Sequence, residues 1–426
     1  MLIEFSVENF RSFKDRATLS MVAAKIRAKY PEIDKNNTFS VSEKLTLLKT
    51  APVYGANASG KSNLVHALNF MRMFILSSSR DSQAGDPIPV DIYRLSVETE
   101  NEPSFFECIF LVEGVQYRYG FEARKDQIVT EWLFTVPSTK EANLFIRDEN
   151  GIVPSAKFKE GKGLEAKTRS NALFLSVVAQ FNGPIAKKIV EWFRNIGIVS
   201  GLDDTAYRLF TVSNFANGNL RTEIIDFVKE LDLGISEIFH INIDKNNVRF
   251  PNELPEEIKK LIMKDVQGDL TTIKTIHHKW GKEKPDTKVT FDMEDESDGT
   301  QKLFFLAGPI MDVLTNGKIL VIDEMEARLH SLLTRAVINL FNSKKTNPKN
   351  AQLIFTTHDT NLLSNKIFRR DQIWFIEKDH KGASHLYSLA ELKVRNDASF
   401  ESDYIEGRYG AIPFLGDLRQ IFIDEE

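Results

Sequence analysis

The chain has 426 residues, of which 42% are hydrophobic, and its formal net charge is −5. This length and composition predict an ordinary globular protein of two or three domains, and the charge excludes a global attraction to nucleic acid. A single cysteine, Cys108, excludes an intrachain disulfide and a cysteine-based zinc site, so we expect it to be a small buried side chain. Neither a basic leader with an apolar block nor an apolar run of about 20 residues occurs, so we expect a cytoplasmic protein without membrane contact.

The N-terminal part of the chain predicts strands on both sides of a poorly patterned segment. Residues 3–7 alternate between apolar and polar side chains, which is the period of a half-buried strand. Residues 25–44 show no clear period, and residues 45–54 favour a second strand. A glycine-rich loop follows. After it, apolar residues at three- and four-residue intervals between 64 and 75 predict a helix.

The middle of the chain changes from strands to helices. Three β-rich runs are separated by short turns and predict an antiparallel meander: 105–111, 115–122 and 128–136. Asn150-Gly151 is typical of a further hairpin turn. Between about 171 and 265 apolar residues recur at helical intervals, so we expect a mainly helical inserted subdomain within 141–284. Its predicted helices are 173–198, 220–233 and 255–266.

The C-terminal third returns to an alternation of helices and strands, after a short strand over 288–293. Alternation of buried strands with helices implies a parallel sheet covered on both faces. The predicted elements are helices at 297–314 and 329–341 and strands at 318–322, 352–356 and 372–376. The chain is therefore expected to have an α/β fold.

The strongest chemical signal is the run Gly55-Ala56-Asn57-Ala58-Ser59-Gly60-Lys61-Ser62, which matches the phosphate-loop pattern between a strand and a helix. Glycines let the backbone fold around a phosphate chain, so that several N–H groups and the positive end of the helix point at it. Lys61 would reach the β- and γ-phosphates, Ser62 would hold Mg²⁺, and Asn63 completes the predicted ATP site. The alternative is a glycine turn with an incidental lysine.

A phosphate loop needs a second, acidic element on a neighbouring strand for hydrolysis. The apolar run 319–322 ends in Asp323 and Glu324, at the edge of the sheet where ligands bind. Asp323 would complete the Mg²⁺ shell through water, and Glu324 would be the general base that activates the attacking water. Alone, such a run is as often a strand entering a turn. Together with the phosphate loop, it favours a catalytic site.

Two further motifs complete the pattern. His358 follows the buried strand 352–356 and would lie at the same sheet edge, where it can donate a hydrogen bond to a γ-phosphate oxygen; a loop histidine is the alternative. Ser297 and Gly299 open the helix that precedes the acidic strand. Ser297 is either a helix N-cap or, with Gly299 and the helix N-terminus, a γ-phosphate ligand. The strand order favours a phosphate that belongs to a partner molecule.

In this order, the four motifs resemble those of the ABC-type ATPase heads of the SMC, RecF and OLD-like group. More narrowly, the chain resembles the bacterial RloA/AbiL-like ATPases of phage-defence and abortive-infection loci, over nearly its whole length. This resemblance is carried by the Ser-x-Gly-x-Gln signature at 297–301, by Asn9-Phe10-Arg11-Ser12-Phe13, by residues 54–63, and by Tyr404-Ile405-Glu406-Gly407-Arg408-Tyr409-Gly410-Ala411-Ile412-Pro413. The two terminal motifs indicate a family without indicating their own chemistry.

The resemblance implies that ATP is sandwiched between two heads. The phosphate loop and acidic pair of one subunit would act with Ser297 and Gly299 of the other, and His358 would sense the γ-phosphate. The sequence departs from the family pattern where Asp298 replaces the usual second glycine of the signature. No clear glutamine-bearing loop follows the phosphate loop, and Tyr93-Arg94-Leu95 would take its place. Residues 10–13 either touch the nucleotide base or end an amphipathic strand.

We therefore expect an ABC-type head built from residues 1–140 and 285–426, with the insertion 141–284 between them. ATP binding would close a homodimer and hydrolysis would open it. By resemblance, the output would be the control of a separate effector, a nuclease or Toprim-like protein, in anti-phage defence. A nuclease within this chain is not expected, because the residues after Ile376 are too few and lack a strand-end Glu followed by an Asp-x-Asp pair.

Two other functions stay open at this point. A RecF- or SMC-like DNA-repair ATPase would bind nucleic acid through a local basic face, but the basic stretches 157–169 and 344–349 are more often solvated loops than binding grooves. A nucleotide-binding subunit of a transporter would have a much shorter interval than that between Lys61 and Ser297. DNA binding that depends on salt and stimulates hydrolysis would favour the first of these.

Overall fold

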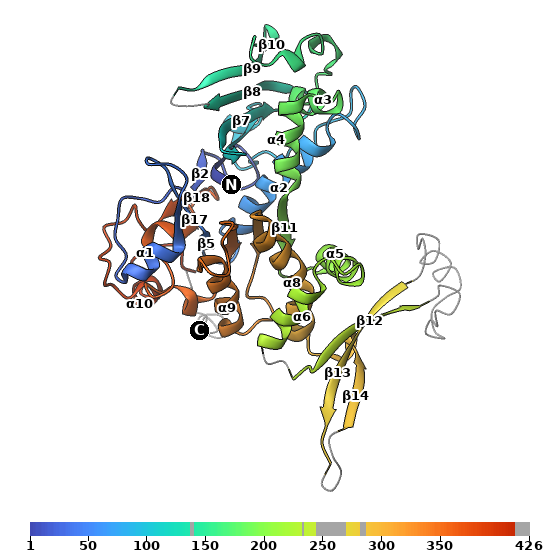
Figure 1. Cartoon of the computed structure of the whole chain (residues 1–426). Helices are drawn as coiled ribbons and strands as arrows, with labels where there is room; N and C mark the ends of the chain where they lie inside the picture. Colours follow the sequence, from blue (N-terminus) through green and yellow to red (C-terminus); the bar gives the residue numbers. More distant parts are fainter. Residues whose placement is uncertain (137–139, 232–233, 244–269, 282–286, 414–426) are drawn as a thin grey trace, which may run out of the picture.

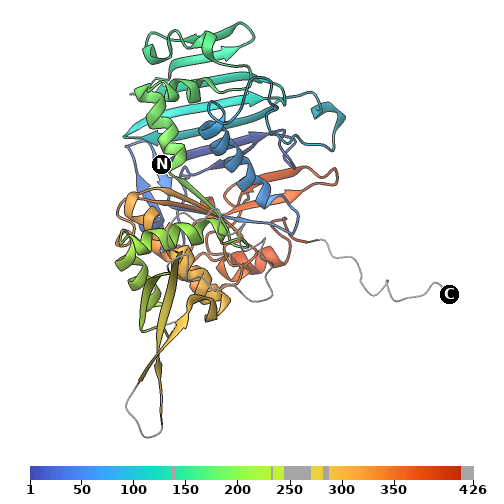
Figure 2. The same ribbon diagram turned by 90° about the vertical axis from the view of Figure 1, so that its right-hand side faces the viewer.

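Two large sheets organise the chain, and helix α2 (Lys61–Ser77) packs between them (Figures 1 and 2). The computed structural model describes residues 1–136, 140–231, 234–243, 270–281 and 287–413. Within these ranges, no helix is both long enough and apolar enough to cross a membrane.

The first sheet has seven antiparallel strands in the order β10-β9-β8-β7-β6-β1-β2. The predicted meander is confirmed as β6 to β8, and the hairpin predicted at Asn150-Gly151 is present with Glu149 and Asn150 in the turn from β9 into β10. The strands are β1 (Leu2–Glu8), β2 (Ala17–Ser20), β6 (Ser104–Val112), β7 (Val115–Ala123), β8 (Ile128–Val136), β9 (Ala142–Asp148) and β10 (Gly151–Pro154).

The second sheet has six strands in the order β11-β15-β16-β5-β17-β18, and all neighbours are parallel except β17 and β18. The predicted α/β fold with a parallel sheet is confirmed. The strands are β5 (Thr50–Tyr54), β11 (Ile196–Ser200), β15 (Ile319–Asp323), β16 (Gln352–Thr356), β17 (Trp374–Lys378) and β18 (Ser384–Ser388).

Strand β15 shows why the parallel strands read as continuous apolar runs. Ile319 and Val321 point into the core that contains α2, whereas Leu320 and Ile322 point into the core on the opposite face. All four side chains are at most 3% exposed. Since a parallel sheet is covered by helices on both sides, neither face needs polar residues.

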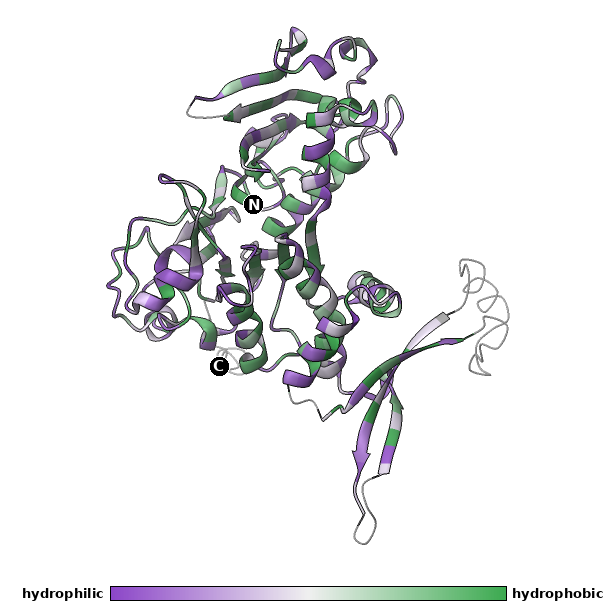
Figure 3. Cartoon of the chain, in the orientation of Figure 1, coloured by the Kyte–Doolittle hydropathy of each residue, from purple (hydrophilic) through white to green (hydrophobic). Residues whose placement is uncertain are grey.

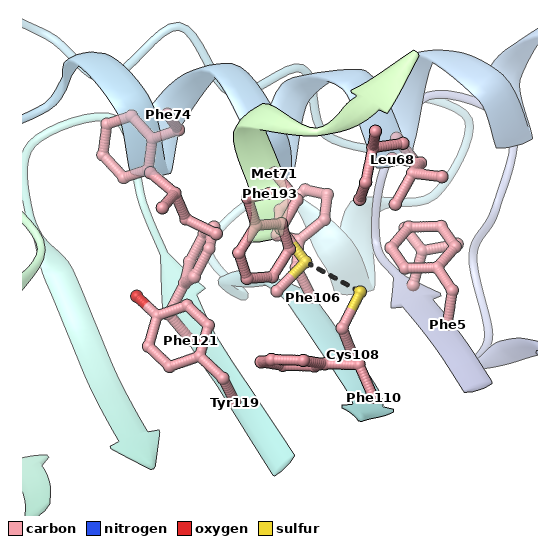
Figure 4. Packing of buried hydrophobic residues seen from close by; sticks show 14 of the residues in the cluster. Phe5, Leu68, Met71, Phe74, Phe106, Cys108, Phe110, Tyr119, Phe121 and Phe193 are labelled. Atoms are coloured by element: carbon pink, nitrogen blue, oxygen red, sulfur yellow. Dashed lines mark hydrogen bonds between the residues drawn. The ribbon is translucent and has the colours of Figure 1, made fainter. Parts of the chain in front are cut away.

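The core between the sheets is rich in aromatic side chains from β6, β7 and α2 (Figure 4). Cys108 lies at its centre, is fully buried, and places its Sγ 3.6 Å from Sδ of Met71 (Figure 4). Burial raises the pKa of the Cys108 thiol well above its ordinary value. The prediction that Cys108 is a small buried side chain is confirmed.

Helices from the second half of the chain cover the other face of the parallel sheet. The longest, α8, contains Pro309, which has no N–H to give to the carbonyl of Phe305. The hydroxyl of Thr211 on α5 donates to that carbonyl instead. The helices on this side are α5 (Thr205–Ala216), α6 (Arg221–Glu230), α8 (Asp298–Asn316), α9 (Ser331–Asn342) and α10 (Phe400–Ile405).

The segment 141–284 differs from the expected helical insertion. Its β9 and β10 extend the antiparallel sheet, and β11 joins the edge of the parallel sheet. The predicted helix 173–198 is instead two helices, α3 (Phe174–Gln180) and α4 (Pro184–Arg194), followed by β11. Gly183 and Pro184 end the first helix and start the second. The predicted helix 255–266 lies outside the described residues.

A three-stranded antiparallel sheet projects from the body next to α5 and α6 (Figure 1). Its strands are β12 (Glu237–Ile243), β13 (Leu270–Lys279) and β14 (Thr287–Asp292). Only β14 was predicted. Hydrophilic and hydrophobic residues are mixed along β13 and β14 (Figure 3), because these strands are only partly buried.

The poorly patterned segment 25–44 contains a short helix, α1 (Pro31–Asn37), and the strand β3 (Thr38–Ser40). The strand predicted over 45–54 is divided at Lys49 into β4 (Thr46–Leu48) and β5. β3 and β4 form a separate two-stranded sheet.

Candidate functional site

The candidate site lies at the C-terminal edge of the parallel sheet, where three strands end. β5 leads into the glycine loop, β15 ends at Asp323, and β16 leads to His358. These strand ends meet because their strands are parallel neighbours, and such an edge is where ligands bind in open α/β sheets. β16 lies between β15 and β5, so the acidic strand is the second neighbour of the loop strand, not its direct neighbour.

Two glycines of the loop are fixed by close packing. A Cβ at Gly55 would overlap the carbonyl oxygen of Ile376, and a Cβ at Gly60 would overlap the hydroxyl of Ser384. Gly60 also has a φ of 113°, a conformation that residues with a side chain rarely adopt. The loop backbone therefore follows a path that only glycine permits at these positions.

Lys61 folds back over the loop that precedes it. Its Nζ donates to the carbonyl oxygens of Gly55 at 3.0 Å and Ala56 at 2.9 Å. The side chain is buried, and burial lowers the pKa of Lys61 to about 8, against the opposing influence of the nearby carboxylates of Glu324 and Asp323. The ammonium group thus lies against the glycine loop, in a position where it can bind an anion.

The loop and the start of α2 fit a phosphate chain. Helix α2 begins at Lys61 without a side-chain cap, so its first N–H groups face the loop. The hydroxyl of Ser59 is buried and has no hydrogen-bonding partner among the described residues. An unpaired buried hydroxyl, a glycine cradle and a partly desolvated lysine are together suited to a polyphosphate.

The acidic turn after β15 is held by two residues that the sequence did not indicate. The hydroxyl of Thr356 donates to Oδ1 of Asp323 at 2.6 Å and accepts from the backbone N–H of Glu324 at 2.7 Å. The backbone N–H of Gly201 donates to the carbonyl of Asp323 at 2.6 Å, and a Cβ on Gly201 would overlap the carbonyl oxygen of Glu324. Glu324 itself has a φ of 51°. Its side chain is therefore aimed by a strained backbone.

Ser62 and Asp323 could hold a magnesium ion. A hydroxyl and a carboxylate are the hard oxygen ligands that Mg²⁺ prefers, and this ion usually completes its shell with water and substrate phosphates. Asp323 is only partly buried. Within the described ranges, no group of three His, Cys, Asp or Glu side chains forms a metal site, so a dedicated protein cage for a metal is not built there.

His358 lies in the electrostatic field of the same site. Desolvation and the positive charge of Lys61 lower its pKa, while Glu326, Glu324 and Asp323 oppose this shift. The structure thus brings together the phosphate-loop lysine, the acidic pair and the histidine, which are far apart in the sequence.

Ser297 is the N-cap of α8, and its Oγ accepts from the backbone N–H of Thr300 at 3.2 Å. Gly299 lies against the loop after β15, where an added Cβ would be 3.1 Å from the carbonyl oxygen of Arg328. The capping role is confirmed, and the role in phosphate binding stays a prediction.

The N-terminal motif, residues 9–13, contacts the start of α2 next to the phosphate loop. Phe10 and Phe13 are at most 2% exposed and belong to the core, so these two rings are not placed for a nucleotide base. Ser12 accepts from Nδ2 of Asn63 at 2.8 Å, and its Oγ lies 2.8 Å from Oγ of Ser384. The motif therefore fixes the start of α2 from one side.

The segment suggested in place of a glutamine loop lies against the same turn. Tyr93 is buried, and its backbone N–H donates to Oδ1 of Asn9 at 3.1 Å. Leu95 is 68% exposed. Tyr93 therefore fixes the segment to the protein interior, whereas the side chain of Leu95 is exposed to solvent.

The C-terminal motif packs against the strand that feeds the phosphate loop. The ring of Tyr404 lies 6.1 Å from that of Tyr54, the last residue of β5, and 5.4 Å from that of Phe375. Tyr387 donates to the carbonyl of Tyr409 at 2.8 Å. Gly410 has a φ of 72° and leaves no space for a side chain beside Tyr387.

Comparison with known proteins identifies one family and several solved structures of low sequence identity. Residues 53–364 match the model of the family described as "AAA domain, putative AbiEii toxin, Type IV TA system". No curated protein matches the chain significantly.

Among solved structures, the chain is similar to the SMC head domain from Thermotoga maritima, with 13% identity and a TM-score of 0.40 over 92% of this chain and 99% of that chain. It is also similar to an SMC head bound to the C-winged helix domain of ScpA, with 16% identity and a TM-score of 0.44 over 91% of this chain and 97% of that chain. A third similar structure is an SMC head domain with an extended coiled coil, bound to the C-terminal domain of ScpA, derived from Pyrococcus furiosus. Its identity is 14% and its TM-score 0.38, over 96% of this chain and 98% of that chain.

Proposed function

Because the chain belongs to the AbiEii-like AAA domain family, we propose that it binds ATP with Mg²⁺, hydrolyses it, and uses this cycle to close and open a homodimer. The observation that carries the proposal is the convergence of Lys61, the acidic pair and His358 at one edge of the parallel sheet. A phosphate-binding loop alone supports binding, whereas a carboxylate at the same edge supports hydrolysis.

Each residue has a proposed task that follows from its surroundings. Lys61 and the N–H groups at the start of α2 bind the phosphates and neutralise their charge. Glu324, aimed by its left-handed backbone, orients and deprotonates the attacking water. Mg²⁺, held by Ser62 and Asp323, would neutralise charge on the β- and γ-phosphate oxygens. His358 donates a hydrogen bond to the γ-phosphate and so distinguishes ATP from ADP.

We propose that Ser297 and Gly299 act on the nucleotide of a partner subunit. Two observations support this assignment. Ser297 caps its own helix, and Gly299 lies against Arg328 in the loop after β15. In the parallel sheet, β16 separates β15 from β5, the strand that leads into the phosphate loop. A helix N-terminus in this place is a suitable anion site for a second molecule that docks face to face, as in a symmetric dimer.

The proposed output is the control of a separate effector, a nuclease or Toprim-like protein, in anti-phage defence. The family description, which names a toxin of a TA system, supports a role in defence. The narrower resemblance to the RloA/AbiL-like group rests on the motifs of the sequence. The closed dimer would present the effector with a surface that the open form lacks, so that ATP occupancy sets effector activity.

Two variants test the proposed function. Lys61→Ala should abolish ATP binding, because it removes the buried cation of the loop. Glu324→Gln should bind ATP but hydrolyse it at least about 100-fold more slowly, which is the lower end of the range for loss of a general base. Light scattering should then show that Glu324→Gln accumulates as a dimer with ATP but not with ADP. A hydrolysis rate in Glu324→Gln equal to that of the wild type would refute the role of Glu324 as base.

A further inference from the structure

Glu326 makes a contact that none of the assigned roles explains. It lies in the loop after β15, two residues beyond Glu324, and is partly buried. Its Oε1 accepts a hydrogen bond from the backbone N–H of His358 at 2.5 Å. This contact fixes the peptide that carries the His358 side chain, because the side-chain oxygen reaches across from the neighbouring loop to hold its N–H.

The loop that carries Glu326 is clamped from both sides. Lys302, which is 3% exposed, donates through Nζ to the carbonyls of Met325, at 3.1 Å, and Ala327. The backbone N–H of Met325 donates to the carbonyl of Thr356 at 3.1 Å. The loop therefore cannot shift without breaking contacts to both α8 and β16.

Lys302 connects this loop to the start of the signature helix. It lies on α8, whose N-cap is Ser297, and its amine is directed at the two carbonyls that flank Glu326. Burial lowers the pKa of Lys302 to about 8, and the negative charge of Glu326 opposes this shift most strongly. A continuous set of contacts thus runs from Ser297 through α8 and Glu326 to His358.

The burial of the Glu326 carboxylate in this loop lowers the stability of the fold. Its second oxygen, Oε2, is buried and has no hydrogen-bonding partner among the described residues, and the same holds for the hydroxyl of Tyr54 and Oδ2 of Asp359. A buried polar atom without a partner costs about 1–3 kcal/mol. Unpaired groups of this kind require an explanation, and they are found at functional sites more than in ordinary cores. Stability is therefore a poor explanation for this carboxylate.

We propose that Glu326 is a positioning residue: it holds the backbone of His358 and couples that histidine, through Lys302, to the helix that begins at Ser297. The inference rests on the proposed ATPase function and adds a connection within it. When Ser297 engages a phosphate, movement of α8 is passed to the loop and so to His358. A displacement of about 1 Å in a positioned group costs roughly 100-fold in rate, which sets the expected scale of the effect.

Three substitutions at Glu326 distinguish the effect of side-chain length from the effect of charge. Glu326→Gln keeps the length and the acceptor oxygen but removes the charge. Glu326→Asp keeps the charge but withdraws the acceptor by one methylene group, and Glu326→Ala removes both. Glu149→Gln, an exposed carboxylate in the turn between β9 and β10, is the matched control. For each purified full-length variant, kcat and KM for ATP are measured, together with ATP binding and the thermal transition.

The proposal predicts that Glu326→Asp and Glu326→Ala lose roughly ten- to 100-fold in kcat while KM changes by less than about threefold. Glu326→Gln should recover most of the wild-type kcat. A Gln variant as slow as the Asp variant would overturn the proposal in favour of a role for charge, and an Asp variant with wild-type kcat would overturn it as well. If Glu326→Ala does not fold, the Gln and Asp variants still decide. Wild-type protein without hydrolysis would overturn the proposed function itself, and this inference with it.

Discussion

Glu324, the proposed general base, shows how a side chain is oriented by backbone that lies far away in the sequence. Its left-handed conformation, with a φ of 51°, is uncommon for a residue with a side chain and costs of order 1–3 kcal/mol. The surroundings that impose it are Gly201, which packs against its carbonyl, and Thr356, which bonds its N–H. Strain of this kind persists only where neighbours over-determine the conformation.

Gly201→Ala tests this explanation. The added Cβ would overlap the carbonyl oxygen of Glu324, so the acidic turn must move. We expect hydrolysis to fall by at least about tenfold, while ATP binding, which depends on Lys61, stays within about threefold. The control is Gly218→Ala, since Gly218 has open space around it, and its φ of 80° strains the substitution at a place unrelated to the acidic turn. Equal rates in Gly201→Ala and the wild type would show that the turn does not depend on this close approach.

The charge of Lys61 predicts how ATP binding varies with pH. Burial lowers the pKa of Lys61 to about 8, so the amine becomes neutral as the pH rises through that value. A neutral amine does not attract phosphate, and the Kd for ATP should increase about tenfold between pH 7 and pH 9. Lys302 has a similar pKa, so Lys302→Met is the matched control, in which the dependence should persist. A constant Kd over this range in calorimetric titrations would contradict the argument.

The sequence predicted the site residues that occur in contiguous motifs, because a phosphate loop or an apolar strand ending in Asp-Glu is local information. It did not predict Gly201, Thr356 or Ser384. These residues act only because distant strands become neighbours, as when the hydroxyl of Ser384 donates to the carbonyl of Ser59 at 2.5 Å. No local pattern marks a glycine or serine whose role is set by a partner more than 100 positions away.

At the scale of elements, helix α8 lacks one helical hydrogen bond at a proline, and the neighbouring helix α5 supplies a replacement. Pro309 leaves the carbonyl of Phe305 without its helical donor, and Thr211, which is fully buried, supplies the missing hydrogen bond from α5. A Cβ on Gly308 would overlap the Thr211 hydroxyl, so the close approach of α5 depends on this glycine as well. The pairing of these two helices therefore places the signature turn at the start of α8.

Thr211→Val should lower stability without a change in shape. The buried carbonyl of Phe305 would lose its donor, which costs about 1–3 kcal/mol in the free energy of unfolding. Ser213→Ala, an exposed change on the same helix, should cost less than about 0.5 kcal/mol. Chemical denaturation of both variants measures the difference. A Thr211→Val protein as stable as the wild type would show that the hydroxyl is not needed to satisfy α8.

Most elements of the two sheets were predictable because their local patterns agree with their final environment. β16 and α8 were found within one or two residues. β11 was missed because its apolar run continues the helical spacing of α4, and only pairing with β15 makes it a strand. β12 and β13 were missed for a related reason, since their stability comes from pairing with each other across residues that are far apart in the chain.

At the scale of the whole molecule, the proposed mechanism requires two copies of the chain. In the proposed dimer, one subunit would hold the nucleotide through Lys61, Asp323 and Glu324, and the start of α8 from the other would complete the site. Closure would then depend on ATP, because the γ-phosphate is the group that both subunits would contact. The three-stranded sheet β12–β14 projects from the body near α5 and α6 (Figure 1).

The most direct measurement of this central claim is a mixing experiment. Lys61→Ala and Ser297→Arg should each be inactive alone, the first because the loop loses its cation and the second because the signature turn is blocked. In a dimer with one subunit of each kind, one of the two composite sites is intact. Random exchange at equal concentrations should therefore restore about a quarter of wild-type hydrolysis. A mixture no more active than either variant alone would contradict a site shared between subunits.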